Sequence, residues 1–117
     1  LLTGHEVVVD GAYMSGADGS VPGLANVDPD GYVRQWQAFE RGDWEAVRAE
    51  QDRLADLMRI VLVKGVQGFG GGVGAFKTAL QLLGVFDSNE MPRPVAALEG
   101  DNVEHVASVL REAGLLS

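Results

Sequence analysis

Apolar and polar positions at the start of this chain predict a strand–helix–strand unit. Residues 1–4 are typical of a short strand that ends at a glycine, and the apolar spacing of residues 6–14 suits a short helix. Turn residues at 16–19 then lead into a brief extended segment, residues 20–23, which closes on a proline and a glycine. Parallel strands need a crossover connection, so the opening of the chain is predicted to be a βαβ unit.

Helical spacing dominates after this unit. Asp28 precedes a proline and can cap a helix that stops at Gly42. A second helix follows Asp43, and its apolar spacing continues to Val61. Trp36, together with the aromatic residues near it, is predicted to pack between these helices rather than to form a stacking platform.

Two further helices are predicted in the second half. One carries apolar residues from Phe76 to Leu83, and the other begins at Asp101, with Glu104 placed as in a capping box. The glycine-rich run at residues 68–74 predicts a flexible or sharply bent loop between helices.

The same glycines also permit a nucleotide-binding hypothesis. Gly70, Gly72 and Ala75 fit the G-x-G-x-x-A pattern, and Glu90 lies where a ribose-binding acid would be expected. However, six residues separate Val63, the end of the candidate strand, from the first glycine, whereas the motif follows its strand directly. A loop is therefore favoured, and a small dinucleotide-binding module remains the alternative function.

Composition narrows the class of protein. The chain has 117 residues (12.4 kDa), enough for one domain, and its 17 acidic against 9 basic side chains give a net charge of −8, which argues against a nucleic-acid partner. The absence of cysteine excludes disulfides, thiolate zinc sites and a cysteine nucleophile. No apolar run is long enough for a membrane span and no export signal is evident, so a cytoplasmic location is expected. The chain opens on an apolar segment without Met, and we expect it to be a piece of a larger polypeptide.

The few histidines and lysines offer limited chemistry. His5 and Glu6 follow the first predicted strand, and α/β enzymes collect functional side chains at the carboxyl ends of parallel strands. This pair could contact a substrate; the alternative is a loop histidine without a role. A lone histidine argues against a metal site. His105 is expected to be solvated on the last helix, and the two lysines, Lys64 and Lys77, are expected to be structural or solvated.

Several stretches, taken in order, carry a family resemblance. They are Leu-Thr-Gly-His-Glu at 2–6, Gly-Ala-Asp-Gly-Ser-Val at 16–21 with Asn26, Gly-Asp-Trp at 42–44 with the helix after it, residues 76–84, Pro-Arg-Pro at 92–94, and residues 110–116. Together they resemble the C-terminal part of the dihydrodipicolinate synthase / N-acetylneuraminate lyase family.

The resemblance implies an α/β fold, the C-terminal portion of a (β/α)8 TIM barrel. Residues 1–41 would hold the last two strand–helix units, and residues 42–117 would form a C-terminal helical region. It also implies a class I lyase or synthase in which a lysine on the sixth strand, upstream of this chain, forms a Schiff base with pyruvate or another 2-keto acid. The family is normally a homotetramer, and no cofactor or metal is expected.

The resemblance also assigns substrate-binding positions. Gly4 would lie beside the pyruvyl group and Val21 near the Schiff-base carbon, while His5 and Glu6 would face the second substrate. No residue of this chain is expected to be catalytic. His5 replaces an aspartate or tyrosine common in the family, and Gly23 stands where sialic-acid lyases have a sugar-contacting serine, so the second substrate stays open. A family member that has lost the lysine and acts as a regulator is a third hypothesis.

Overall fold

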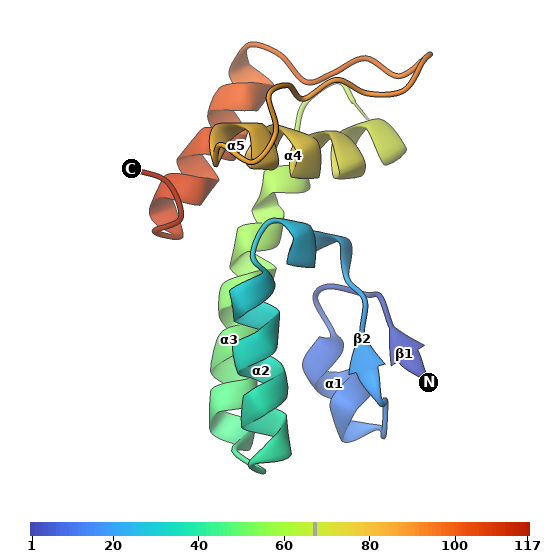
Figure 1. The fold of residues 1–117 in the computed structure, drawn as a ribbon, viewed down its shortest axis with the longest axis vertical. Coiled ribbons are helices and arrows are strands. Elements are labelled where there is room, and N and C mark those ends of the chain that lie inside the picture. The colour runs from blue at the N-terminus through green and yellow to red at the C-terminus, as the bar shows by residue number, and fades with distance from the viewer. Residues whose placement is uncertain (67) are drawn as a thin grey trace. The chain divides into compact units, whose positions relative to one another are not determined.

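The computed structural model describes residues 1–66 and 68–117, which form two compact units (Figure 1). One unit comprises Leu1–Met58 and the other Arg59–Ser117. The boundary between them falls inside the predicted helical region 42–117. Among the described residues, no helix combines the length and the apolar character needed to cross a membrane.

The first unit opens with the predicted βαβ arrangement. Strand β1 (Leu2–Thr3) pairs in parallel with β2 (Gly19–Ser20), and α1 (Val9–Met14) connects them. The register places Leu2 opposite Gly19 and Thr3 opposite Ser20, and the Val21 amide continues the pairing by donating to the Thr3 carbonyl at 2.7 Å. The expected strand–helix–strand opening is therefore confirmed, although the strands and the helix are shorter than the sequence pattern indicates.

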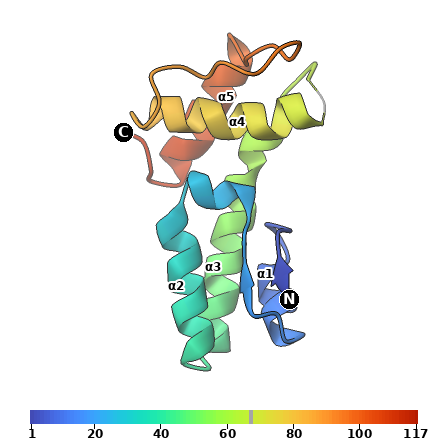
Figure 2. The ribbon, with the colours of Figure 1, turned by 45° about the vertical axis from the view of Figure 1, so that its right-hand side comes forward.

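Two capped helices form a hairpin beside this unit. After a short 3-10 helix, η1 (Gly23–Asn26), helix α2 (Pro29–Glu40) lies alongside α3 (Trp44–Leu57), as both ribbon views show (Figures 1 and 2). The Asp28 side chain accepts from the Gly31 amide at 3.2 Å, and the Asp43 side chain accepts from the Ala46 amide at 3.1 Å. Gly42 makes the turn between them with φ +72°, a backbone conformation that glycine tolerates. The predicted Asp28 cap is confirmed, and Asp43, where the next helix was predicted to start, caps that helix as well.

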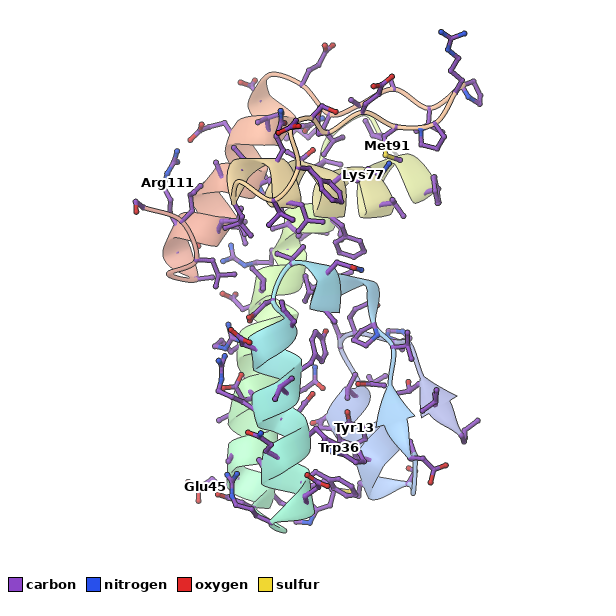
Figure 3. The ribbon with its side chains drawn as sticks, viewed as in Figure 1. Tyr13, Trp36, Glu45, Lys77, Met91 and Arg111 are labelled. Carbon is purple, nitrogen blue, oxygen red and sulfur yellow. The ribbon has the colours of Figure 1, made fainter. Side chains whose placement is uncertain are left out.

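Aromatic residues fill the space between α1 and the hairpin. Tyr13 lies 5.1 Å, ring centre to ring centre, from both Trp36 and Phe39, and Phe39 lies 5.6 Å from Trp44. Figure 3 shows the Tyr13 and Trp36 side chains together. These ring contacts confirm the predicted packing role. Aromatic pairs of this kind contribute about 0.5–1.5 kcal/mol each beyond the burial of their surface.

The second unit corrects the prediction for the glycine run. Helix α4 (Phe69–Leu82) begins within that run, so Gly70–Gly74 is helical rather than a loop. A Cβ on Gly70 would lie only 2.9 Å from a Val66 methyl group, and one on Gly74 would contact Leu98 at 3.5 Å. Because side chains are missing there, residues 95–98 pack closely against the helix, and this packing outweighs the low helix propensity of glycine.

The last helix also starts differently from the prediction. Helix α5 (Asp101–Glu112) has Gly100, with φ +58°, at its N-cap, and no side chain that the structure describes caps it. Asp101 therefore lies in the first turn, and the predicted capping box is wrong. Glu104 instead accepts from Arg111 at 2.8 Å.

An irregular segment, residues 83–100, connects α4 to α5. Asn89 anchors it, because its side-chain amide donates to the Thr78 hydroxyl at 3.0 Å and to the Leu98 carbonyl at 2.8 Å. Met91 and Leu98 are buried, so the segment covers one face of the second unit.

Candidate functional site

The structure brings the four predicted site residues to one edge of the sheet. Gly4, His5 and Glu6 directly follow β1, and Val21 directly follows β2. A Cβ placed on Gly4 would lie 3.4 Å from the Val21 carbonyl oxygen, so the two strand ends lie side by side. Because the strands are parallel, both carboxyl ends open on the same edge, which is where sites form in α/β proteins.

Glu6 is tied into its surroundings. Its carboxylate accepts from the Gly23 amide at 3.0 Å, which links the loop after β1 to the loop after β2. Its backbone carbonyl accepts from the Gln51 side-chain amide at 3.0 Å and, at the long distance of 3.5 Å, from the Tyr32 hydroxyl. Glu6 is therefore held through both its side chain and its backbone.

His5 and Val21 are, by contrast, open to solvent. The His5 side chain is exposed, while its backbone amide donates to the Thr3 hydroxyl at 3.4 Å. Val21 is 70% exposed although it is apolar. An exposed imidazole and an exposed valine at a strand-end edge can both contact a bound molecule.

The Tyr32 hydroxyl has a strongly perturbed environment. Burial is the main factor that raises its pKa, and the nearby Glu6 and Asp28 carboxylates raise it further. The phenol therefore stays protonated throughout the ordinary pH range and serves as a neutral hydrogen-bond donor beneath the Glu6 backbone.

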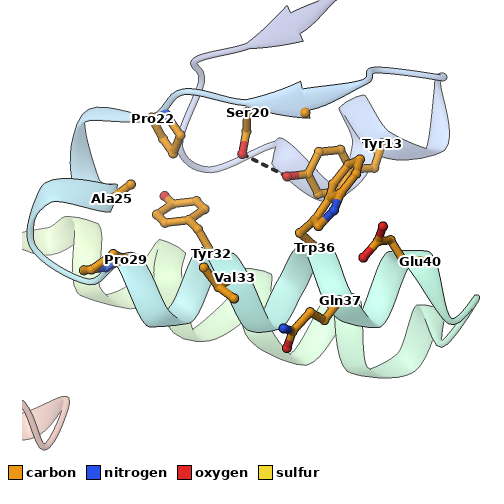
Figure 4. A pocket seen from close by; sticks show the side chains of 11 residues that line it. Tyr13, Ser20, Pro22, Ala25, Pro29, Tyr32, Val33, Trp36, Gln37 and Glu40 are labelled. Atoms are coloured by element: carbon orange, nitrogen blue, oxygen red, sulfur yellow. Dashed lines mark hydrogen bonds between the residues drawn. The ribbon is translucent and has the colours of Figure 1, made fainter.

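A hollow of about 470 Å³ lies between β2 and α2 (Figure 4). Its walls are largely apolar, with Pro22, Val33 and Trp36 among them. The Tyr13 and Ser20 hydroxyls lie next to each other in its lining and form a hydrogen bond of 2.8 Å (Figure 4).

The position of the glycines in the structure does not favour the nucleotide-binding alternative. Gly70, Gly72 and Ala75 lie inside helix α4, whereas the motif requires a loop between a strand and a helix. The candidate strand before them is also absent from the described residues, since Met58–Val61 forms the 3-10 helix η2.

Two other expectations have different outcomes. His105 is not simply solvated, because its Nε2 lies 2.8 Å from the Arg59 carbonyl oxygen and forms a hydrogen bond with it. Lys77 has the expected structural role, donating to the Glu90 carbonyl at 3.1 Å, and Lys64 is exposed. The described residues include no group of three or more carboxylate or imidazole side chains that could hold a metal ion.

Sequence reasoning missed Gln51, the residue that holds Glu6 from α3. Gln51 is only 4% exposed and lies between Val47 and Leu54 on the buried face of its helix. A glutamine at a position where the helical pattern calls for an apolar side chain is the signal that could have found it, because a buried amide needs hydrogen-bond partners.

The parallel βαβ unit, with its candidate site at the carboxyl edge, places the protein in the class of α/β proteins. Within that class, the chain belongs to the dihydrodipicolinate synthetase family, whose sequence model matches residues 1–113. Two uncharacterized DapA-like lyases, from two strains of Halobacterium salinarum, are each 31% identical to it over 115 residues. This match covers 98% of the chain but only 36% of each relative, so the chain spans about a third of their length.

Solved structures agree with this assignment. The chain is similar to dihydrodipicolinate synthase from Bacteroides thetaiotaomicron, with a TM-score of 0.85 and 28% identity, over 95% of this chain and 37% of that one. It is also similar to the Thermotoga maritima enzyme, with a TM-score of 0.80 and 27% identity, over 97% of this chain and 36% of that one. These neighbours are barrel enzymes, and the two-stranded, helix-rich chain matches about a third of each. The recognition of the family from sequence is confirmed.

Proposed function

We propose that this chain is the C-terminal part of a pyruvate-dependent Schiff-base lyase or synthase, whose catalytic lysine lies on an upstream strand. One observation carries the proposal: in a chain of this family, Gly4, His5, Glu6 and Val21 gather at the carboxyl edge of two parallel strands. This edge is where a barrel enzyme assembles its site from several strand-end loops.

In the proposed chemistry, the upstream part supplies the lysine that bonds to the substrate, and this chain supplies residues that contact the substrates. The upstream lysine amine attacks the C2 carbonyl of pyruvate, water leaves, and an imine forms. Loss of a C3 proton to a base then gives an enamine, whose C3 forms a carbon–carbon bond with an aldehyde; cleavage is the reverse. In this chain, the backbone of Gly4 and the side chain of Val21 would line the pyruvyl end. His5 and Glu6 would face the second substrate.

Exposed apolar side chains around β1 and β2 support the proposal that strands of an upstream part complete the sheet. Leu1, Leu2 and Val21 are exposed around the two short strands, and the hollow between β2 and α2 is apolar. A parallel sheet is normally buried on both faces, so such surface fits strands that pair within a larger barrel. The family likeness adds a homotetramer to the proposal, and the cytoplasmic location expected from the sequence is proposed with it.

The test is the intact mass of the natural polypeptide before and after incubation with pyruvate and borohydride. A chain well over twice 12.4 kDa that gains one reduced pyruvyl group is the expected result. A long polypeptide that gains no adduct with pyruvate, or with other small 2-keto acids, would favour the family member without a catalytic lysine. A natural chain of 12.4 kDa without an adduct would also refute the proposal.

A further inference from the structure

The amide of Gln51 bridges the two ends of the loop between β1 and α1. Its Nε2 donates to the Glu6 carbonyl at 3.0 Å, and its Oε1 accepts from the Asp10 amide at 3.0 Å. The N-cap of α1, Val8, offers no side-chain hydrogen bond in the part of the chain that the structure describes. Gln51, although 41 residues away, therefore caps the first turn of α1 and holds the loop before it.

A second buried amide fixes the orientation of the first. Gln35, on α2, is fully buried, and its Nε2 donates to Gln51 Oε1 at 3.1 Å and to the Val47 carbonyl at 3.4 Å. Since Oε1 of Gln51 already accepts two N–H groups, its Nε2 must face the Glu6 carbonyl. A flipped amide would set donors against donors at Asp10 and Gln35. Both amides come from the α2–α3 hairpin, and Gln51 connects this hairpin to the loop.

We propose that Gln51 is a positioning residue that acts on the site through Glu6. The Glu6 carboxylate carries the same constraint to the Gly23 amide, so that the loops after β1 and β2 are held as one unit. His5 directly precedes the anchored Glu6, and its side chain is left exposed to face the second substrate. The inference rests on the proposed function and adds to it the element that sets the geometry of the site edge.

Three variants of the natural full-length polypeptide test the proposal. Gln51→Leu removes both hydrogen bonds at nearly constant size. Gln51→Glu keeps an acceptor for the Asp10 amide but loses the donor to the Glu6 carbonyl. Ala38→Gly is the matched control, because Ala38 is buried in α2 and its loss destabilises the hairpin without touching the loop.

Two readouts are measured on each variant: amide hydrogen exchange over residues 5–12, and the rate at which pyruvate plus borohydride yields the trapped adduct. In Gln51→Leu we expect exchange at Asp10 to be about tenfold faster, because its buried amide loses its partner. Trapping should be severalfold slower, because the Glu6–Gly23 contact then no longer holds the loop after β2, whose Val21 lines the proposed pyruvyl end. Gln51→Glu should keep Asp10 protected while trapping stays slow. Ala38→Gly should change neither readout relative to the unaltered protein.

Each contrary outcome has a definite meaning. Unchanged exchange in Gln51→Leu would show that the residue does not anchor the loop. Faster exchange with unchanged trapping would reduce Gln51 to a purely structural role, and normal trapping in Gln51→Glu would show that it does not act through Glu6. If the unaltered protein traps no pyruvate, the proposed function fails, while the exchange measurement still decides whether Gln51 anchors the loop.

Discussion

Substitution of Gly31 by alanine probes the part-buried ion pair between Asp28 and Arg53 at the start of α2. Gly31 lies in the first turn of the helix, and its amide donates to the Asp28 carboxylate. A Cβ at this position would lie 2.2 Å from Nη2 of Arg53, 2.6 Å from Oδ2 of Asp28 and 2.9 Å from a Leu54 methyl group. Arg53 and Asp28 pair with each other, so the new methyl group would enter the space between a buried carboxylate and its guanidinium.

The expected cost follows from these distances. The guanidinium would have to move away to reach van der Waals contact, which weakens its pairing with Asp28. Overpacking costs about 1–3 kcal/mol, and the weaker pairing adds to this cost because the Asp28 carboxylate is buried. Replacing a helical glycine with alanine returns about 0.5–1 kcal/mol. We therefore expect Gly31→Ala to lower the free energy of unfolding by about 2 kcal/mol.

The assay is urea unfolding of the natural polypeptide, with Gly11→Ala as the matched control. Gly11 is also a helical glycine, in α1, but nothing lies within 4 Å of a Cβ placed on it. Its substitution should raise the free energy of unfolding by about 0.5–1 kcal/mol. Equal shifts of both variants in the same direction would refute the claim that the Asp28–Arg53 pair forbids a side chain at Gly31.

Two further predictions concern charge and packing. Burial raises the pKa of Glu50, but hydrogen bonds from Arg34 and Arg53 outweigh burial and lower it. A lowered pKa stabilises the fold above about pH 4.5 and loses this effect as the pH falls through the lower folded-state value. Glu50→Gln should therefore cost about 1 kcal/mol at pH 7 in urea unfolding, and progressively less as the pH falls below about 4.5. In α4, Gly72→Ala should stabilise the protein by about 0.5–1 kcal/mol and Gly70→Ala should destabilise it, because only the latter Cβ meets a valine side chain, at 2.9 Å. Thermal melting of both variants checks this difference, and equal melting temperatures would contradict it.

Local chemistry made much of the fold predictable. Asp28 caps its helix as expected, because a short carboxylate side chain before a helical run can accept from an amide of the first turn. Gly42 ends α2 because a positive φ follows from the tight turn. The βαβ opening could be predicted because an apolar strand–helix–strand order has one common solution.

The errors share a tertiary origin. The low helix propensity of glycine predicted a loop at residues 70–74. The segment is helical because residues 95–98 pack closely against α4 where the glycines have no side chains. Aspartate is a common N-cap residue, so Asp101 was predicted to cap α5. The N-cap is instead Gly100, because the chain enters α5 with a positive φ at that residue. Local sequence patterns predict neither feature. The packing on α4 depends on residues distant along the chain, and the start of α5 depends on the path by which the chain enters that helix.

The candidate site shows the same division. The strand–helix–strand pattern predicted the carboxyl edge and the His5–Glu6 pair beside it, whereas Gly4 and Val21 were assigned by the family resemblance. The distinct roles of His5 and Glu6 could not be predicted, since both are polar residues in the same loop. The contacts of Glu6 separate the two residues. Gln51 holds the Glu6 backbone carbonyl, and the Glu6 carboxylate accepts from the Gly23 amide in a second loop. His5 is therefore the exposed side chain of the pair. Under the proposed function, discrimination of the second substrate is expected to depend on residue 5, while residue 6 holds the loop that carries it.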